Sequence, residues 1–184
     1  MKRIFLLLVV AFAFASCAED VKFNDPSLQA MNGEKLFRAL APRAIQNPDG
    51  TISLEGEYRF EELQIKVASA EPGTYLFGVN TNTVANYSYK SDGMILEYST
   101  LDGITNPNMQ DNLGEITIYE ADNPLASKEP GTISGVFKFN AKLTQSNPFG
   151  QSNVFLQQGH FYGLKFQTAL PEPDNGDTDI DEAP

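Results

Sequence analysis

The residue pattern of Ile133–Leu143 places the tightest limit on the fold of this 184-residue chain, because apolar and polar residues alternate along the whole stretch. Successive side chains of a β-strand point to opposite faces, so this alternation is typical of a half-buried strand. One face collects Phe137, Phe139, Ala141 and Leu143, and the other collects Lys138, Asn140 and Lys142. After residue 16, no stretch keeps a 3.6-residue apolar period for more than about two turns. These patterns predict an all-β fold.

Short runs of β-type residues, separated by Gly, Pro and Asn, recur along the chain with no crossover helix between them. The expected strands are Ser27–Met31, Glu34–Leu40, Thr51–Glu55, Leu63–Val67, Val84–Tyr89, Met94–Ser99, Glu115–Tyr119, Ile133–Leu143, Val154–Leu156 and Phe161–Gln167. We therefore expect a single antiparallel β-sandwich, or a partly closed barrel, of about 8–10 strands. This domain would span residues 27–170.

Turn residues indicate how these strands connect. Asn32-Gly33 predicts a type I′ hairpin turn, and Lys90–Gly93 predicts a second hairpin. Glu71–Thr74 and Glu129–Thr132 share a Pro-Gly centre, which is the signature of a type II turn. Gln158-Gly159 is expected to be a turn, and Gly135 is expected to mark a β-bulge. Loops are expected at residues 41–50, 104–112 and 144–152.

The N-terminus has the composition of a cleaved targeting peptide. Lys2 and Arg3 precede twelve apolar residues, Ile4–Ala15, which as a helix would reach only about 18 Å of a hydrocarbon layer about 30 Å thick. Ala15 and Ser16 then lead into Cys17, an arrangement that resembles the lipobox of bacterial lipoproteins. The resemblance implies cleavage after residue 16 and acylation of Cys17, for example with palmitate. The alternative is an ordinary secretory signal followed by an incidental cysteine.

Two segments flank the expected domain. Residues 17–26 show neither alternation nor a helical period, and we interpret them as a tether. Residues 171–184 contain six acidic residues and no basic residue, and we interpret them as a disordered acidic tail. The expected organisation is thus a lipoprotein signal peptide at 1–16, the tether, the β domain at 27–170 and the tail.

The charge and cysteine content exclude several classes of function. Removing residues 1–16 removes Lys2 and Arg3, which leaves 11 basic residues against 24 acidic ones and a formal net charge of −13. Such a chain repels phosphate backbones, so we expect no nucleic acid partner. Cys17 is the only cysteine, so no disulfide and no thiol catalyst is expected. Contact with a membrane is expected through the lipid on Cys17.

The order of the strand and turn signals resembles a family of small all-β, Gram-negative (Bacteroidota-type) lipoproteins of unknown function. The segments that carry the resemblance are Asn32-Gly33, Gly73–Tyr75, Gly114–Ile118, Ile133–Phe139 and Val154–Phe161. The resemblance covers roughly residues 27–167. It implies an all-β fold in the cell envelope, and it implies no activity.

No residue pattern provides a catalytic, metal or cofactor site. His160 is the only histidine, and we expect a surface or turn residue without a catalytic role. Gly131–Gly135 has its serine one position too late for a nucleophile elbow. One histidine and one cysteine cannot supply a structural zinc site. Asp177, Asp179 and Asp181 have the opening spacing of an EF-hand loop, but Glu182 stands where the loop requires glycine.

Aromatic and loop-tip residues are the remaining candidates for ligand contacts. We expect core or cross-strand positions for most tyrosines of the strands: Tyr87, Tyr89, Tyr98 and Tyr119. Met109 and Phe149 are large apolar residues within polar loops, where they can fold back as anchors or insert into a partner. No ligand-binding residue is identified from the sequence.

Two functions remain open from the sequence. The first is a lipid-anchored binding or structural module of the outer membrane, facing the periplasm or the medium, with a protein or a glycan as partner. The second is an envelope hydrolase that acts on glycans through paired carboxylates. The missing catalytic constellation favours the first.

Overall fold

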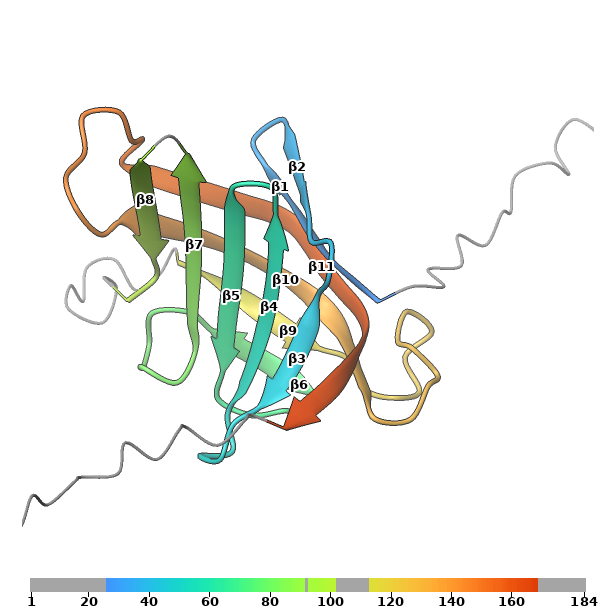
Figure 1. The fold of residues 1–184 in the computed structure, drawn as a ribbon. Coiled ribbons are helices and arrows are strands. Elements are labelled where there is room, and N and C mark those ends of the chain that lie inside the picture. The colour runs from blue at the N-terminus through green and yellow to red at the C-terminus, as the bar shows by residue number, and fades with distance from the viewer. Residues whose placement is uncertain (1–25, 92, 102–112, 169–184) are drawn as a thin grey trace, which may run out of the picture.

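A computed structural model describes residues 26–91, 93–101 and 113–168, and these residues form strands and connecting loops without a helix (Figure 1). The eleven strands are β1 (Ser27–Asn32), β2 (Lys35–Arg38), β3 (Arg43–Gln46), β4 (Ile52–Tyr58), β5 (Glu61–Val67), β6 (Gly73–Leu76), β7 (Val84–Ser91), β8 (Met94–Ser99), β9 (Gly114–Ile118), β10 (Thr132–Leu143) and β11 (Asn153–Thr168). The expected all-β fold class is confirmed. Within the described ranges, no helix has the length and apolar character needed to span a membrane.

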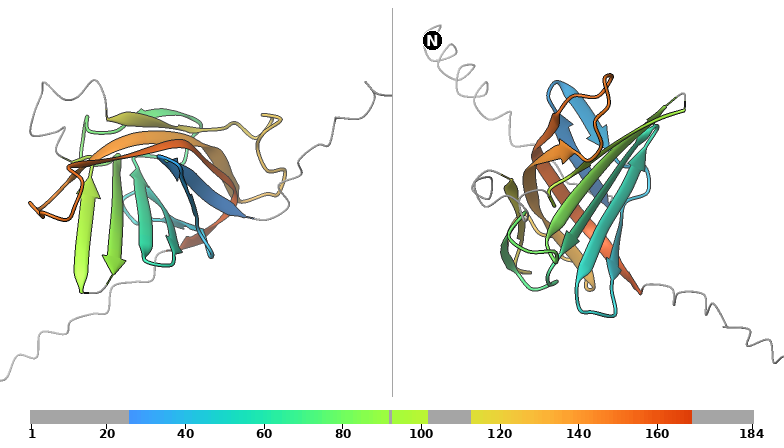
Figure 2. Two further views of the ribbon diagram at one scale, coloured as in Figure 1. Left: turned by 90° about the horizontal axis from the view of Figure 1, so that it is seen from above. Right: turned by 90° about the vertical axis from the view of Figure 1, so that its left-hand side faces the viewer.

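The strands form one continuous sheet in the order β2-β1-β11-β3-β4-β5-β7-β8-β10-β9-β6, and a further pairing of β10 with β11 closes part of it into a ring. The ring contains seven strands: β3, β4, β5, β7, β8, β10 and β11. The two longest strands, β10 and β11, form one curved layer with β9, β6, β1 and β2, and the other layer, across the core, comprises β3, β4, β5, β7 and β8 (Figure 2). The fold is therefore a partly closed barrel with two extended edges.

Two short strands lie where the sequence predicts loops or turns, which raises the strand count above the expected 8–10. β3 lies in the expected loop 41–50, and β6 begins at the expected turn Glu71–Thr74. β3 pairs in parallel with the end of β11, although all pairings were expected to be antiparallel. Strands of four residues carry little periodicity, so pairing with distant segments decides their conformation.

The interior is packed with aromatic and aliphatic side chains from both layers. The predicted inward face of β10 is confirmed, since Phe137, Phe139 and Ala141 are buried and Leu143 packs against the core while half-buried. Phe139 stacks on Phe137 with ring centroids 6.2 Å apart and meets Phe77 edge-on at 5.7 Å. On the opposite face Lys138 is exposed as expected, whereas Asn140 and Lys142 are half-buried.

The structure corrects two of the predicted turns and confirms a third. The first hairpin forms, but its loop is Gly33-Glu34, because Asn32 pairs with Lys35 and only Gly33 has positive φ (+60°). A positive φ at the first loop position alone is typical of a type II′ turn. Gly73 has a φ of +151° and starts β6 instead of forming a type II turn, whereas Gly131, with a φ of +71°, fits one.

The expected turn at Gln158-Gly159 is wrong, because β11 runs unbroken through it. The register between β10 and β11 shifts there, so this segment is a β-bulge within a strand. Gln158 has a φ of +50° and is one of two described non-glycine residues with positive φ. The bulge expected at Gly135 is confirmed by a second register shift.

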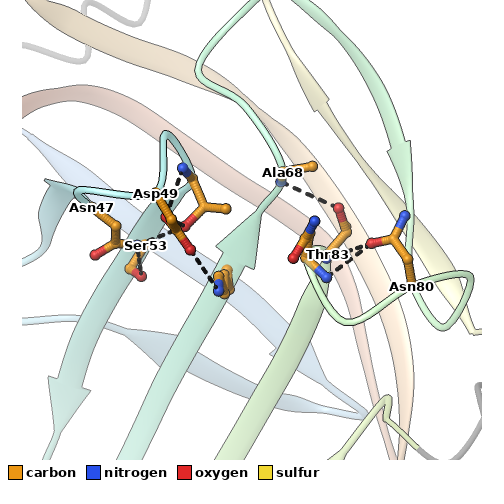
Figure 3. A network of polar contacts seen from close by, with 9 residues as sticks. Asn47, Asp49, Ser53, Ala68, Asn80 and Thr83 are labelled. Atoms are coloured by element: carbon orange, nitrogen blue, oxygen red, sulfur yellow. Dashed lines mark hydrogen bonds and ion pairs between the residues drawn. The ribbon is translucent and has the colours of Figure 1, made fainter.

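A polar network lies around the β3–β4 loop at one end of the barrel (Figure 3). Asp49 accepts hydrogen bonds from the backbone N–H of Thr51 (3.0 Å) and from its hydroxyl (2.6 Å), and forms an ion pair with Lys66. These bonds hold the pKa of Asp49 below its usual value. Asn47 donates to the hydroxyls of Thr51 and Ser53. We interpret this network as structural, because its polar atoms bond one another.

Candidate functional site: an outer groove on the long strands

A groove of about 810 Å³ crosses the outer surface of the curved layer, where β10 and β11 change register. We call it the outer groove. Its lining comprises Leu76, Val79, Gly114, Glu115, Lys138, Phe139, Asn140, Phe155, Leu156, Gln157 and Gln158. These residues come from β6, β9, β10 and β11 and the loop after β6. The groove therefore depends on strands that are far apart in sequence.

Three large apolar side chains of the outer groove remain exposed to solvent. Phe155 is 49% exposed, Leu76 is 54% exposed and Val79 is 49% exposed. Phe155 faces outward because its neighbours Val154 and Leu156 point into the core. An apolar surface beside polar groups is the usual composition of a small-molecule site.

The bulge in β11 places two consecutive amides on the outer surface. Gln157 and Gln158 are both exposed, whereas a regular strand would turn one of them inward. A glutamine with positive φ is sterically unfavourable, and such residues are enriched in binding and active sites. The imidazole of His160, two residues further along β11, hydrogen-bonds the backbone of Gln158 and so supports the bulge.

Asn140 contributes a third amide, which lies opposite Phe155 in the register of β10 and β11. Its Oδ1 is shielded from solvent and has no hydrogen-bond partner among the residues that the structure describes. A buried acceptor without a donor costs about 1–3 kcal/mol of folding free energy. Residues that carry such a cost are candidates for ligand contacts.

Opposite charges compensate one another within the outer groove. Lys138 Nζ lies 3.0 Å from Glu115 Oε1, and the two residues are partners in the pairing of β10 with β9. The groove therefore presents no net charge, although the whole chain has a formal net charge of −11.

Gly114 allows β9 to approach β10 closely at the floor of the outer groove. Its φ is +102°, and a Cβ atom there would lie 2.0 Å from the carbonyl oxygen of Lys138. Only glycine fits this conformation and this contact. The shape of the groove therefore requires Gly114.

A family model described as a domain of unknown function, DUF6252, matches residues 24–165, a range that includes the whole outer groove. The chain belongs to the DUF6252 family. Comparisons with curated proteins and with solved structures give no significant match.

His160 of this DUF6252 domain lies within β11 and is half-buried, so the expected surface or turn position is wrong. It is the register partner of Gln29 on β1 and of Val136 on β10. Burial lowers the pKa of His160, and its hydrogen bond to the backbone of Gln158 acts in the opposite direction. The imidazole of His160 is therefore mainly neutral, and we interpret its role as structural support of the bulge at Gln158.

Three of the four tyrosines take the core or cross-strand positions that the sequence predicts, whereas Tyr119 lies one residue beyond the end of β9. Tyr87 and Tyr98 are buried, whereas Tyr89 and Tyr119 are half-buried. The Tyr87 hydroxyl donates a hydrogen bond to the carboxylate of Glu61. Burial, together with this carboxylate, raises the pKa of Tyr87 far above its ordinary value.

Of the two apolar loop tips, Phe149 is 83% exposed and does not fold back as an anchor. Met109 lies outside the described residues, as do Cys17 and the three aspartates Asp177, Asp179 and Asp181. Ser134, from the near-match to a nucleophile elbow, lies inside β10. Its Oγ accepts hydrogen bonds from the backbone N–H groups of Ser127 and Gly163.

Several carboxylates lie away from the outer groove, where Glu55, Glu57 and Glu62 line a smaller pocket of about 350 Å³. No group of three His, Cys, Asp or Glu side chains in those residues is arranged to hold a metal ion. Glu57 and Glu62 are register partners on the outside of β4 and β5, and Glu62 forms an ion pair with Lys90 at 2.7 Å. The described lining of the outer groove contains one carboxylate, that of Glu115, which is paired with Lys138.

Sequence reasoning missed the four residues that give the outer groove its chemistry: Asn140, Phe155, Gln157 and Gln158. The alternation of β10 places Asn140 on the outer face correctly, but the groove also requires the register shift opposite it. The available signal was the break in alternation at Gln157-Gln158, which fits a bulge as well as a turn.

Proposed function

We propose that this DUF6252 protein is a lipid-anchored binding module of the cell envelope and that the outer groove is its binding site. The observation that carries the proposal is Asn140 Oδ1, which is buried beside the half-exposed ring of Phe155 and has no hydrogen-bond partner within residues 26–91, 93–101 and 113–168. A buried acceptor and an exposed aromatic ring are both costly features in the free protein, and a ligand can compensate for both.

The position of the outer groove suits a tethered module. Ser27, where the first strand begins, pairs with Tyr162, whereas Asn32 at the end of that strand pairs with Leu156 beside the groove. Five residue steps of a strand span roughly 17 Å, so the groove lies away from the point where the tether would enter. The proposed anchor at Cys17 rests on the lipobox-like sequence alone.

We propose binding and not hydrolysis because the described lining of the outer groove has no pair of carboxylates. Glycoside hydrolysis commonly uses two carboxyl groups about 5–10 Å apart across a cleft. Among the residues that the structure describes, one carboxylate lines the outer groove, that of Glu115, and its charge is compensated by Lys138.

Anchoring is tested with the full chain expressed in a Gram-negative host that is fed labelled palmitate. We expect label in the wild-type protein and its recovery with the outer membrane, and no label in Cys17→Ser. One acyl chain holds a protein only marginally and several hold it stably, so the variant should leave the membrane or remain an uncleaved precursor. An unlabelled wild-type protein would refute the lipid anchor.

Protease added to intact cells then distinguishes display to the medium from a periplasmic position.

Binding through the outer groove is tested by photo-crosslinking in living cells. Benzoylphenylalanine placed at Gln157 should form an adduct with an envelope component, because Gln157 is exposed in the groove. The matched control is the same substitution at Gln64, an exposed glutamine on β5 in the opposite layer. Equal adducts at both positions, or none at Gln157, would contradict the proposal.

A further inference from the structure

The side chains of the outer groove indicate the chemical class of ligand that it would hold, on the premise that the proposed binding function is correct. We propose that the groove binds a neutral glycan. A sugar ring would lie against Phe155, and the amides of Asn140, Gln157 and Gln158 would hydrogen-bond its hydroxyls.

The charges of the groove favour a neutral ligand. Lys138 and Glu115 neutralise each other at 3.0 Å, so neither is free to bind an ion. An anionic ligand would also be repelled by a chain with a formal net charge of −11. A cationic ligand would have to compete with Lys138 for Glu115, which is the one carboxylate among the described residues of the lining.

The polar groups of the groove match hydroxyl groups. Each of the three amides offers two N–H donors and a carbonyl acceptor, and a hydroxyl also donates and accepts. A hydroxyl can therefore satisfy Asn140 Oδ1, whereas a purely apolar ligand would leave it without a partner. Because Oδ1 is shielded from solvent in the free protein, a side chain of the groove wall must move as the hydroxyl enters.

The apolar part of the groove matches the C–H face of a sugar ring. Phe155 is half-exposed, and of the aromatic rings in the described lining it alone has substantial exposure, because Phe139 is buried. A flat aromatic surface next to hydrogen-bonding groups suits a ligand that has one apolar face and a polar rim. Leu76 and Val79 add apolar surface from β6 and the loop after it.

The backbone beneath the groove argues against an extended peptide as the ligand. A peptide that adds to a sheet needs a strand edge with free N–H and C=O groups. In the described residues β9, β10 and β11 are each paired on both sides, and the one free strand edge beside the groove is that of β6, the four-residue strand that ends the sheet. Recognition at the floor must therefore come from side chains, as it does for sugars.

The test measures binding by the full-length chain in detergent, using affinity electrophoresis and thermal shift. The neutral probes are cellohexaose, maltohexaose, xylohexaose and yeast mannan. The charged probes are polygalacturonate, which is anionic, and chitosan oligosaccharide, which is cationic. We expect at least one neutral probe to bind and to raise the thermal midpoint, with both charged probes at least tenfold weaker.

Two variants assign the binding to the groove. Phe155→Ala and Asn140→Leu should each weaken binding of the neutral probe at least tenfold. The control is Phe149→Ala, which removes another exposed phenylalanine outside the groove lining and should change binding less than twofold. The inference is overturned if no neutral probe binds, if a charged probe binds most tightly, or if the groove variants bind like the wild type.

The crosslinking experiment separates a failure of this inference from a failure of the proposed function. A groove-specific adduct at Gln157 without binding of any neutral probe would overturn the glycan ligand and leave the binding module in place. Neither an adduct nor glycan binding would overturn both.

Discussion

Gly159 lies opposite Phe137 across the pairing of β10 with β11, and the phenylalanine ring fills the space that a side chain at 159 would need. A Cβ atom on Gly159 would lie 2.5 Å from ring carbons of Phe137. The reverse arrangement occurs two residues along β10, where Gly135 is opposite Phe161 and a Cβ would meet its ring at 2.5 Å. Two glycine–phenylalanine pairs therefore allow the long strands to pack closely at the core.

Gly159→Ala should consequently destabilise the protein by overpacking, at a cost of about 1–3 kcal/mol in urea denaturation. Gly33→Ala is the control for backbone conformation, because Gly33 has a φ of +60° and nothing within 4 Å of its would-be Cβ. We expect a cost of about 1–2 kcal/mol there from the left-handed conformation alone. Repacking should distinguish the two: Phe137→Leu added to Gly159→Ala should recover part of the loss and should not help Gly33→Ala.

Phe139→Ala should lower the free energy of unfolding by about 3–5 kcal/mol, because it leaves a cavity beside Phe77 and Phe137. The next residue supplies the control. Lys138→Ala removes only an exposed ion pair, which contributes about 0–1 kcal/mol. A loss below about 1 kcal/mol for Phe139→Ala would mean that the two faces of β10 are reversed.

Asn140→Leu should raise the free energy of unfolding by about 1 kcal/mol, because it removes a buried acceptor for which the described part of the chain offers no donor. The measurement is the thermal midpoint without ligand. Asn140→Leu should have a higher midpoint than the wild type, although the same variant should lose ligand binding. A marked destabilisation would show that the Asn140 amide is satisfied in the free protein and serves the fold.

Protonation of His160 should destabilise the protein at mildly acidic pH. Burial keeps the pKa of His160 low in the folded state, so the unfolded state takes up a proton first as the pH falls through about 6.5. Stability should be constant above that pH and fall below it, until folded His160 also protonates. This is the only histidine, so His160→Asn should flatten the profile between about pH 5 and 6.5. If stability falls with pH as steeply in His160→Asn as in the wild type, other titratable groups cause the pH dependence.

Deletion of residues 171–184 should leave the thermal midpoint nearly unchanged. This prediction rests on the sequence, since these residues lie outside the described part of the chain and carry six acidic residues with little apolar surface. The measurement compares melting curves of the full chain and of the deletion variant, each with and without calcium. A large drop on deletion, or a calcium-dependent melt that disappears with the tail, would indicate a metal site there.

Much of the fold could be predicted because its longest strands carry a period of two. The faces of β10, the bulge at Gly135 and the paired strands β7 and β8 all follow from alternation and turn residues near one another in sequence. β3 could not be predicted, because four residues hold no clear period and its conformation depends on the far end of β11.

The outer groove is harder to predict for the same physical reason. Asn140 and Phe155 become neighbours only through a specific register, and a register depends on the whole sheet. Gln158 fits a turn as well as a bulge when it is considered with its sequence neighbours alone. A site built from four strands therefore has no contiguous motif.

The last strand has a consequence for the time at which the protein can fold. β11 pairs with β1 at the beginning of the domain, with β3, and with β10. Its pairing partners therefore lie as far apart in the sequence as residues 27 and 142. A chain that emerges from its N-terminus can form the hairpins from β4 to β8, but the ring has no closing strand until residue 168 is available. Pairing between such distant segments is slow. The unfinished chain would thus remain an open meander, and the ring would close only after the whole of β11 has been synthesised.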